Sequence, residues 1–288
     1  MTADLPLVVD GAWLEARLGD PRLRIVDATA HLRLPADGSV ELRPGRESYA
    51  REHIPGAVFA DLLGDLADRD APLPFTVPAS ERFARCMGAL GVGEGTYVVV
   101  YDQLDPARDP ENYQLWAPRL WWHLRLEGFD DVAVLDGGLG AWKAEGRPVT
   151  SAPSSYPPAA FRARRRPELL ADTDEVAAAI ADDDVVIINA LTAESYAAAR
   201  IPRSHNVSFT LIVDPTTGRM RSADELRPHF ERTGALDRGR RAITYCGGGI
   251  AACVGALALA RLGRGDVAVY DGSMSAWTAD PGRRVERG

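Results

Sequence analysis

The sequence predicts an α/β protein of two tandem domains, each with a central, mostly parallel sheet flanked by helices on both faces. Three observations indicate this fold class. The chain has 288 residues, which is enough for two domains of ordinary size. Short apolar runs alternate with amphipathic segments along both halves, as expected for strands of a parallel sheet and the helices between them. The second half also repeats motifs of the first half, which indicates a duplicated domain.

Four pairs of matching motifs carry this internal repeat. They are Arg24–Ala28 with Val186–Ala190, His53–Ala57 with Arg200–Ser204, Val98–Asp102 with Ala242–Cys246, and Asp131–Trp142 with Asp266–Trp277. The pairs occur in the same order in both halves. Chance similarity does not preserve order over such distances, so we expect the two halves to share one topology.

The apolar runs and helix-start signals place the individual elements. Strands are predicted near Leu7–Val9, Arg24–Asp27, Val58–Asp61, Tyr97–Tyr101 and Val132–Leu135, and then near Val185–Asn189, Asn206–Ser208, Ala242–Tyr245 and Val267–Tyr270. Helices are predicted after Tyr49, Ser80, Gln114, Asp174, Ser222 and Ala251. Acidic residues directly follow Ser80 and Asp174, as is typical of the first turn of a helix.

A proline-rich stretch separates the two halves. We therefore predict an N-terminal domain over residues 1–148, a linker over residues 149–168 and a C-terminal domain over residues 169–288. The linker contains Arg164, Arg165 and Arg166 in succession. Three adjacent arginines could bind an anion, but a solvated linker face is the simpler interpretation.

The composition is typical of a globular protein and excludes several function classes. Hydrophobic residues make up 46% of the chain and charged residues 26%. The net charge of −8 argues against a nucleic-acid-binding surface. The 3 cysteines include no Cys-x-x-Cys pair, so neither a disulfide framework nor a zinc site is expected, and a reducing compartment fits. No apolar run is long enough to span a membrane, and the N-terminus does not resemble a signal peptide, so we expect a cytoplasmic protein.

The stretch from Ala242 to Leu262 contains the candidate nucleophile. An apolar run ends at Cys246, Gly247–Gly249 follow, and an Ala/Leu-rich helix begins near Ala251. A strand, a glycine turn and a helix N-terminus together form an anion site, because backbone N–H groups converge there. A cysteine above such a site favours a thiolate or a persulfide, both of which are anions. A buried cysteine before a tight turn is the alternative, and the three successive glycines count against it.

The first half has lost this arrangement. Asp102 stands where the second half has Cys246, and Gln103, Leu104 and Asp105 replace the glycines. A carboxylate cannot carry sulfur and would repel an anionic substrate. We therefore expect the first half to be non-catalytic and to form one wall of the substrate cleft.

A cysteine above backbone amides would also suit a phosphatase. That chemistry needs an arginine six positions after the cysteine, where its guanidinium clamps the phosphate. The residue at this position is Ala252, and residues 247–251 contain no arginine. A phosphatase is therefore not expected.

Taken together, the motifs resemble the two-domain rhodanese family, which comprises the thiosulfate and 3-mercaptopyruvate sulfurtransferases. The segments that carry the resemblance are Cys246–Ala251, His53–Ala57, Ala117–Trp122, Asp136–Gly138 and Asp271–Ser273. The resemblance implies that each half is a rhodanese-like domain and that only the C-terminal one is active. Cys246 would take sulfane sulfur from thiosulfate or 3-mercaptopyruvate as a persulfide, and would pass it to cyanide or to a thiol. No metal and no organic cofactor is implied.

The resemblance also assigns substrate-binding residues. They are the loop residues Gly247, Gly248, Gly249, Ile250 and Ala251, together with His53 and Arg200. His53 would face the cleft from the N-terminal domain, and its alternative role is a histidine hydrogen-bonded within its own turn. Arg200, or else Arg203, could replace family arginines whose matching positions here are Leu191 and Ser195.

The candidate loop departs from both family types. Thiosulfate-type loops often have a cation after the cysteine, where this chain has Gly247. Mercaptopyruvate-type loops carry hydroxyl groups at the positions of Gly248 and Ala251. These losses leave a second hypothesis open: a degenerate rhodanese that relays sulfur to a protein acceptor or merely binds a partner protein.

Overall fold

The computed structural model describes residues 5–33, 41–103 and 116–288, and these residues form two compact units. Unit 1 comprises Met1–Asp70, Val77–Arg165 and Pro215–Arg219, and unit 2 comprises Ala71–Thr76, Arg166–Asp214 and Met220–Gly288. The predicted domains were contiguous stretches, whereas the two units exchange short segments. Residues 71–76 of the first half thus belong to the unit that contains Cys246.

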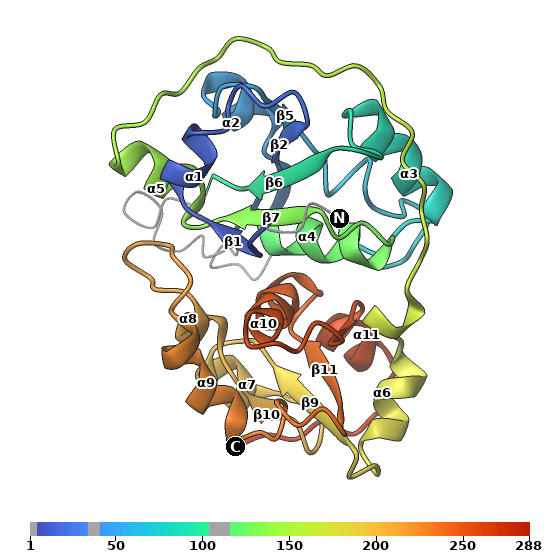
Figure 1. Cartoon of the computed structure of the whole chain (residues 1–288). Helices are drawn as coiled ribbons and strands as arrows, with labels where there is room; N and C mark the ends of the chain where they lie inside the picture. Colours follow the sequence, from blue (N-terminus) through green and yellow to red (C-terminus); the bar gives the residue numbers. More distant parts are fainter. Residues whose placement is uncertain (1–4, 34–40, 104–115) are drawn as a thin grey trace. The chain divides into compact units, whose positions relative to one another are not determined.

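Unit 1 contains a five-stranded parallel sheet in the order β1-β7-β6-β2-β5 (Figure 1). Its strands are β1 (Val8–Val9), β2 (Leu23–Asp27), β5 (Ala57–Phe59), β6 (Tyr97–Tyr101) and β7 (Val132–Leu135). A separate antiparallel pair joins β3 (Ala30–Arg33) to β4 (Glu41–Pro44). The helices are α1 (Gly11–Glu15), α2 (Arg46–Arg51), α3 (Ser80–Ala89), α4 (Trp116–Leu126) and α5 (Gly138–Ala144).

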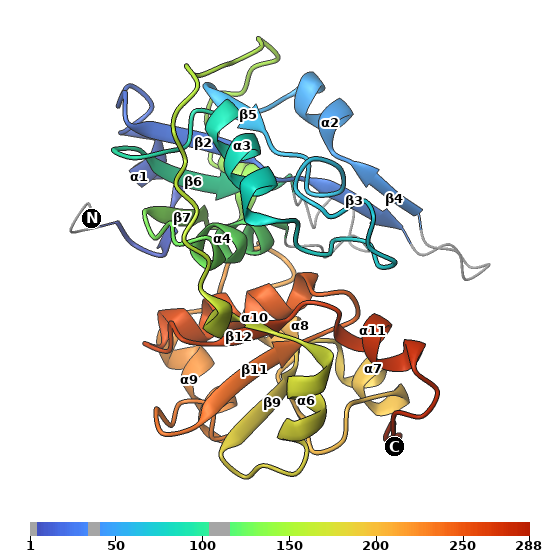
Figure 2. The same cartoon turned by 90° about the vertical axis from the view of Figure 1, so that its right-hand side faces the viewer.

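Unit 2 repeats this architecture with a parallel sheet in the order β10-β9-β11-β12-β8 (Figure 2). Its strands are β8 (Leu170–Ala171), β9 (Val185–Asn189), β10 (His205–Asn206), β11 (Arg241–Tyr245) and β12 (Ala268–Tyr270). The helices are α6 (Thr173–Ala179), α7 (Ala193–Ala198), α8 (Phe209–Ile212), α9 (Ala223–Glu231), α10 (Ile250–Arg261) and α11 (Ser273–Ala279), with a 3-10 turn, η1 (Pro167–Leu169), before β8.

The register of the central strands confirms the duplication. In unit 1, β2 pairs with β6 from Leu23 opposite Tyr97 to Asp27 opposite Tyr101. In unit 2, β9 pairs with β11 over the equivalent positions, from Val185 opposite Arg241 to Asn189 opposite Tyr245. Because a one-residue slip would turn every side chain to the other face, the shared register keeps equivalent residues in equivalent cores.

Alternate residues of each sheet build the two cores. In unit 1, one face of the sheet packs with α1 and α5 around Trp142, while α4 contacts β6 and β7. In unit 2, one face packs with α6 and α11 around Trp277, while α10 contacts β11 and β12. The two tryptophans are equivalent in the repeat, and each indole donates to a carbonyl of the chain leaving its helix, Pro148 at 2.7 Å and Arg284 at 3.0 Å. The predicted fold class is confirmed.

Several short elements differ from the predictions. The antiparallel pair β3–β4, strand β8 and the helices α1, α5, α7, α8 and α11 were not predicted, because segments this short show no clear periodicity. The strand predicted at Val58–Asp61 runs from Ala57 to Phe59, and the one predicted at Asn206–Ser208 is His205–Asn206. The helix expected after Tyr49 already begins at Arg46. Gln114 lies outside the described residues.

Arg165, one of the three successive arginines of the predicted linker, binds two residues of unit 1. Arg165 donates through Nε to Glu127 at 2.8 Å and through Nη2 to the carbonyl of Pro78 at 2.7 Å. Glu127 is 0% exposed. The interpretation of the three arginines as a solvated linker face therefore holds for the exposed Arg164. It is wrong for Arg165, which supplies the charged partner that the buried Glu127 carboxylate needs.

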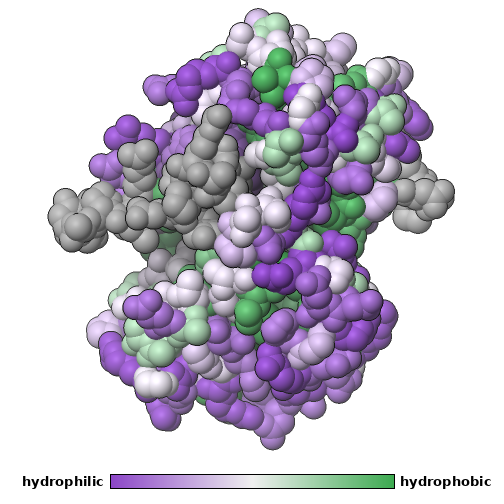
Figure 3. All heavy atoms as spheres, turned by 90° about the vertical axis from the view of Figure 1, so that its left-hand side faces the viewer, coloured by the Kyte–Doolittle hydropathy of each residue, from purple (hydrophilic) through white to green (hydrophobic). Residues whose placement is uncertain are grey.

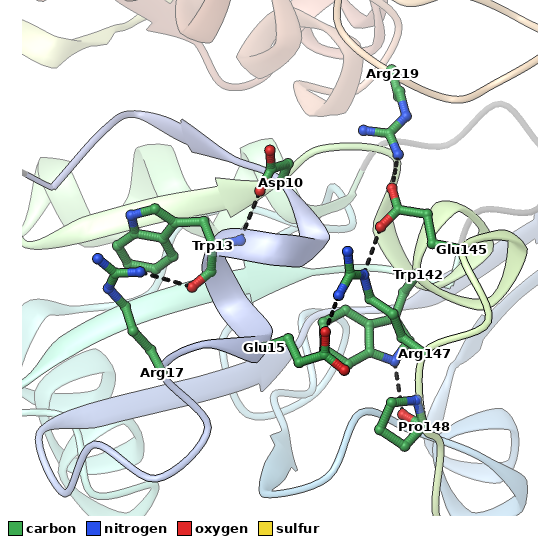
Figure 4. Close-up of polar contacts among 9 residues, drawn as sticks. All are labelled: Asp10, Trp13, Glu15, Arg17, Trp142, Glu145, Arg147, Pro148 and Arg219. Carbon is green, nitrogen blue, oxygen red and sulfur yellow. Dashed lines mark hydrogen bonds and ion pairs between the residues drawn. The ribbon is translucent and has the colours of Figure 1, made fainter.

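The segment Pro215–Arg219 is held in unit 1 by a chain of charges (Figure 4). Arg219 is paired with Glu145, and Glu145 also accepts from Arg147 Nε at 2.6 Å. Arg147 in turn is paired with Glu15. Because the charges alternate in sign, the Glu145 carboxylate contacts two guanidinium groups and the Arg147 guanidinium contacts two carboxylates.

Hydrophilic side chains predominate on the face that Figure 3 shows. Among the described residues, Val149 and Leu211 are the large apolar side chains that stand exposed. No helix within residues 5–33, 41–103 and 116–288 has the length and apolar character that a membrane span requires.

Candidate active site

Cys246 follows the last residue of β11 and precedes the glycine loop that leads into α10. This is the strand–loop–helix order that the sequence predicts. In parallel sheets of this kind, ligands bind beyond the carboxyl ends of the strands, which is where Cys246 lies. The residue is buried, with 2% of its surface exposed.

One loop amide contacts the thiol directly. The N–H of Gly249 donates to Cys246 Sγ at 3.1 Å. Gly249 caps α10 with φ +83°, a left-handed conformation that glycine adopts readily and other residues do not. The partial positive charge of the helix N-terminus adds to this donor and favours an anionic sulfur.

Ser273 is a second neighbour of the candidate nucleophile, and the sequence interpretation missed it. Its Oγ accepts from the Cys246 N–H at 3.0 Å, donates to the Tyr270 carbonyl at 2.8 Å, and lies 3.9 Å from Cys246 Sγ. The buried Ser273 has φ +48°, which is uncommon for a residue other than glycine. The motif Asp271–Ser273 was noticed as part of the internal repeat and of the family resemblance, without a role for the serine.

The start of α11 holds the backbone of the loop. Met274 N–H donates to the Cys246 carbonyl at 3.0 Å. The N–H and the hydroxyl of Ser275 both donate to the Gly247 carbonyl at 2.9 Å. Two loop carbonyls are therefore engaged away from the thiol, so the loop can present N–H groups to a negative charge.

The middle of the loop is lined by a side chain from the first half of the sequence. A Cβ atom built on Gly248 would lie 3.7 Å from Cδ2 of Phe75, and one built on Gly247 would meet no heavy atom within 4 Å. Phe75 belongs to the Ala71–Thr76 segment of unit 2. No sequence signal marked this residue, because it lies far from Cys246 along the chain.

His53, which the resemblance implies as a substrate ligand, has its described contacts within unit 1. It lies in unit 1, is 1% exposed and stacks on Tyr49. Its Nδ1 lies 2.7 Å from the Tyr49 carbonyl and its Nε2 lies 3.0 Å from the Ala152 carbonyl. Both ring nitrogens thus lie within hydrogen-bond distance of backbone oxygens, one close in the sequence at Tyr49 and one far along the chain at Ala152.

The two candidate cations contact other parts of unit 2. Arg200 Nη1 donates to the Gly288 carbonyl at 2.6 Å, and its Nε lies 3.6 Å from a Glu286 oxygen. Arg203, with φ +60°, donates to the Ile180 carbonyl and is paired with Asp183. These contacts do not include residues of the loop 246–251, and the replacement of the missing guanidinium by Arg200 stays a prediction.

In unit 1 the equivalent anion site is filled by the protein itself. The Asp102 carboxylate accepts from the N–H of Ala117, in the first turn of α4, at 2.9 Å. Asp102 is buried, and its position matches that of Cys246 in unit 2. Where unit 2 presents a sulfur to a helix N-terminus, unit 1 presents a carboxylate, which cannot act as a sulfur carrier.

Among residues 5–33, 41–103 and 116–288, no group of three His, Cys, Asp or Glu side chains is placed to hold a metal ion.

Comparisons with known proteins agree with the two-domain fold. The sequence model of the rhodanese-like domain matches residues 10–145 and 172–280. The 3-mercaptopyruvate sulfurtransferase of Escherichia coli K12 is 33% identical over 96% of this chain and 97% of its own length. The thiosulfate sulfurtransferase of Mus musculus is 33% identical over 98% of this chain and 95% of its own length. The crystal structure of SseA from Escherichia coli superposes with a TM-score of 0.78 at 33% identity, covering 93% of this chain and 99% of that one.

Proposed function

Because the chain belongs to the rhodanese-like family and is a sulfurtransferase, we propose that it moves sulfane sulfur through a persulfide on Cys246. The observation that carries this proposal is the hydrogen bond from the Gly249 amide to Cys246 Sγ at the N-terminus of α10. This amide is placed to donate to the terminal atoms of a sulfur-loaded cysteine as well as to Sγ itself.

In the first half-reaction, the Cys246 thiolate attacks the donor sulfur that is to be transferred and forms a sulfur–sulfur bond with it. This atom is the outer sulfur of thiosulfate or the thiol sulfur of 3-mercaptopyruvate. With thiosulfate, the donor's own sulfur–sulfur bond breaks and sulfite leaves with the electron pair. With 3-mercaptopyruvate, the carbon–sulfur bond breaks, and the thiol proton of the donor ends on that carbon to give pyruvate. Both donors leave Cys246 as an anionic persulfide.

In the second half-reaction, an acceptor attacks the outer sulfur of the persulfide. Cyanide becomes thiocyanate, and a thiol becomes a persulfide, while the Cys246 thiolate is regenerated. The outer sulfur stands about 2 Å beyond Sγ. Residues 247–251, whose side chains are small or apolar, would surround it, and the Gly249 amide is the donor beside Sγ.

Mass spectrometry of the intact protein tests this proposal. Incubation with thiosulfate or 3-mercaptopyruvate should add the mass of one sulfur atom, and cyanide should remove it. Cys246→Ala should abolish the gain in mass. Cys86→Ala removes a thiol in α3 of unit 1 and serves as the matched control, which should still load sulfur. Sulfur loading that persists in Cys246→Ala would exclude the mechanism.

A protein acceptor is the second candidate, favoured by the low exposure of Cys246 and by a loop without a side-chain cation. A docked protein could open the loop and deliver or receive sulfur directly. In that case turnover with free donors would be near background, and a partner protein would restore it. Full turnover with thiosulfate alone would exclude this candidate.

A further inference from the structure

The two units differ at the end of a central strand next to the strand that leads to the candidate nucleophile. β2 ends at Asp27 and β9 ends at Asn189. The shared register makes these residues equivalent, because they lie opposite Tyr101 and Tyr245. Cys246 directly follows Tyr245, and the N–H of the residue after Asn189 donates to the Tyr245 carbonyl at 2.8 Å. Unit 1 thus has an acid at this place, and unit 2 has the neutral amide of the same shape.

In unit 1 the buried acid is satisfied by donors from neutral groups. Asp27 is 0% exposed, and burial raises the pKa of its carboxyl group, while hydrogen bonds from Thr29 and Gln103 oppose that rise. Its Oδ1 accepts from the Thr29 N–H at 2.9 Å, and its Oδ2 accepts from Gln103 Nε2 at 2.8 Å. Gln103 directly follows Asp102, so the loop of unit 1 supplies a donor that this buried acid needs.

In unit 2 both the acid and the loop donor are absent. Gly247 stands where unit 1 has its glutamine, and a Cβ built on Gly247 would meet no heavy atom within 4 Å. Asn189 is also 0% exposed, and its Oδ1 accepts from the Leu191 N–H at 2.8 Å. The amide nitrogen Nδ2 therefore takes the place of Asp27 Oδ2, and it forms no hydrogen bond of standard length and angle among the described residues. It acts on the nearby Tyr245, where it opposes the rise that burial causes in the pKa of that tyrosine.

The tyrosine beside this position is also used differently in the two units. In unit 1 the Tyr101 hydroxyl donates to Asp27 and helps to lower the pKa of that carboxyl group against the effect of burial. In unit 2 the Tyr245 hydroxyl lies 2.8 Å from Ser204 Oγ. Because Ser204 Oγ donates its own proton to the Ile201 carbonyl at 2.6 Å, Tyr245 is the donor of this pair. Its proton is therefore not available to a carboxylate at the end of β9.

A charge at the end of β9 would act on the Cys246 sulfur. Neighbouring strands lie about 4.8 Å apart, and solvent screens buried charges weakly. A carboxylate there would oppose an anionic thiol or persulfide. We propose that Asn189 is a positioning residue that keeps this strand end neutral and thereby favours the anionic sulfur, and that Gly247 is its matched partner, since the loop needs no donor where there is no buried acid. This inference rests on the proposed sulfur transfer through Cys246.

The test is a double-mutant cycle of Asn189→Asp and Gly247→Gln in the full-length protein. The rate at which iodoacetamide, an uncharged reagent, alkylates Cys246 is measured against pH, and peptide masses locate the alkylated cysteine. Asn189→Asp should raise the pH of half-maximal rate by about one unit in both backgrounds, because a nearby like charge disfavours the thiolate. Its loss in urea midpoint should be smaller in the Gly247→Gln background, where the added glutamine can donate to the new carboxylate as Gln103 does in unit 1.

Asp27→Asn is the matched control, since it makes the reverse change at the equivalent place in unit 1 and should leave the pH profile of Cys246 unchanged. A profile that does not move in folded Asn189→Asp would overturn the role of Asn189, and equal losses in urea midpoint in both backgrounds would contradict the pairing with Gly247. If Asn189→Asp folds only together with Gly247→Gln, the pairing is supported, and the double variant is compared with Gly247→Gln for the pH profile. Alkylation does not require sulfur transfer, so the absence of any sulfur on Cys246 of the wild-type protein would instead overturn the proposed function.

Discussion

The amide nitrogen of Gly249 lies 3.1 Å from the sulfur of Cys246, and this contact joins the nucleophile to the N-terminus of α10. In unit 1 the corresponding partners are the carboxylate of Asp102 and the amide of Ala117, 2.9 Å apart. Both halves of the duplication thus place an acceptor at the start of a helix. The acceptor is a sulfur in one copy and a carboxylate in the other, and only a sulfur could carry the proposed persulfide.

Gly249→Ala should reduce sulfur loading on Cys246 by at least about tenfold, because a left-handed residue at this position aims the amide at the sulfur. Gly263→Ala is the matched control. Gly263 has φ +91° just beyond the other end of α10, so alanine there imposes a similar backbone cost without touching the loop. Equal losses of activity in the two variants, measured by persulfide mass, would assign the effect to stability alone.

Substitutions at Gly247 and Gly248 should change the donor preference in opposite directions. Gly247→Arg adds a cation where a Cβ meets no heavy atom within 4 Å, and it should raise kcat/KM for thiosulfate. Gly248→Ser adds a hydroxyl where the nearest heavy atom is 3.7 Å away, and it should raise kcat/KM for 3-mercaptopyruvate. Each change is expected to be about tenfold, as for one added polar contact. The idea fails if both donors respond alike to each variant.

Ser273→Ala should weaken the site, since the Cys246 N–H and the Tyr270 carbonyl would both lose their partner in a buried place. The expected loss of stability is about 1–3 kcal/mol, together with slower persulfide formation. Ser275→Ala removes a hydroxyl whose acceptor, the Gly247 carbonyl, keeps the Ser275 N–H. Urea unfolding and the rate of sulfur loading distinguish the two variants, and equal effects would contradict a specific role for Ser273.

Arg165→Ala should destabilise unit 1 by about 3 kcal/mol, because it leaves the buried Glu127 carboxylate without its charged partner. Arg164→Ala removes the neighbouring exposed arginine and should change stability little. Adding Glu127→Gln to Arg165→Ala should recover part of the loss. The urea midpoints of the three variants are the measurement. Identical midpoints for Arg165→Ala and Arg164→Ala would contradict a stabilising contact between Arg165 and Glu127.

Acid should destabilise the protein through His123. Burial and the nearby Arg119 and Arg165 charges hold the pKa of this histidine well below its usual value of 6.5. As the pH falls below 6.5, the unfolded chain binds a proton that the folded chain refuses, so stability is lost. His123→Leu should remove that contribution, which grows by up to about 1.4 kcal/mol per pH unit. His229→Gln is the control for loss of a histidine outside the core, and parallel stability profiles of His123→Leu and the wild type would contradict this assignment.

The parts of the fold that could be predicted are those with repeated or periodic patterns. The central strands β2, β6, β7, β9 and β11 were placed to within a residue or so, since buried parallel strands read as continuous apolar runs. The edge strands and the short helices were shifted or missed, because two to seven residues are too few to show a period. His53 and Arg200 were assigned by resemblance, and the contacts of both residues lie elsewhere.

The sequence alone determined the duplication, the fold class, the family and the position of Cys246 between a strand and a glycine turn. These features are local in the chain or are copied within it, so they can be read from residue order. Only the tertiary structure decided which groups surround the sulfur. Phe75 and Ser273 meet the glycine loop from distant segments, Arg165 neutralises Glu127, and Arg200 pairs with the C-terminal residues. Such contacts depend on packing between segments far apart in the chain, which no local pattern of residues encodes.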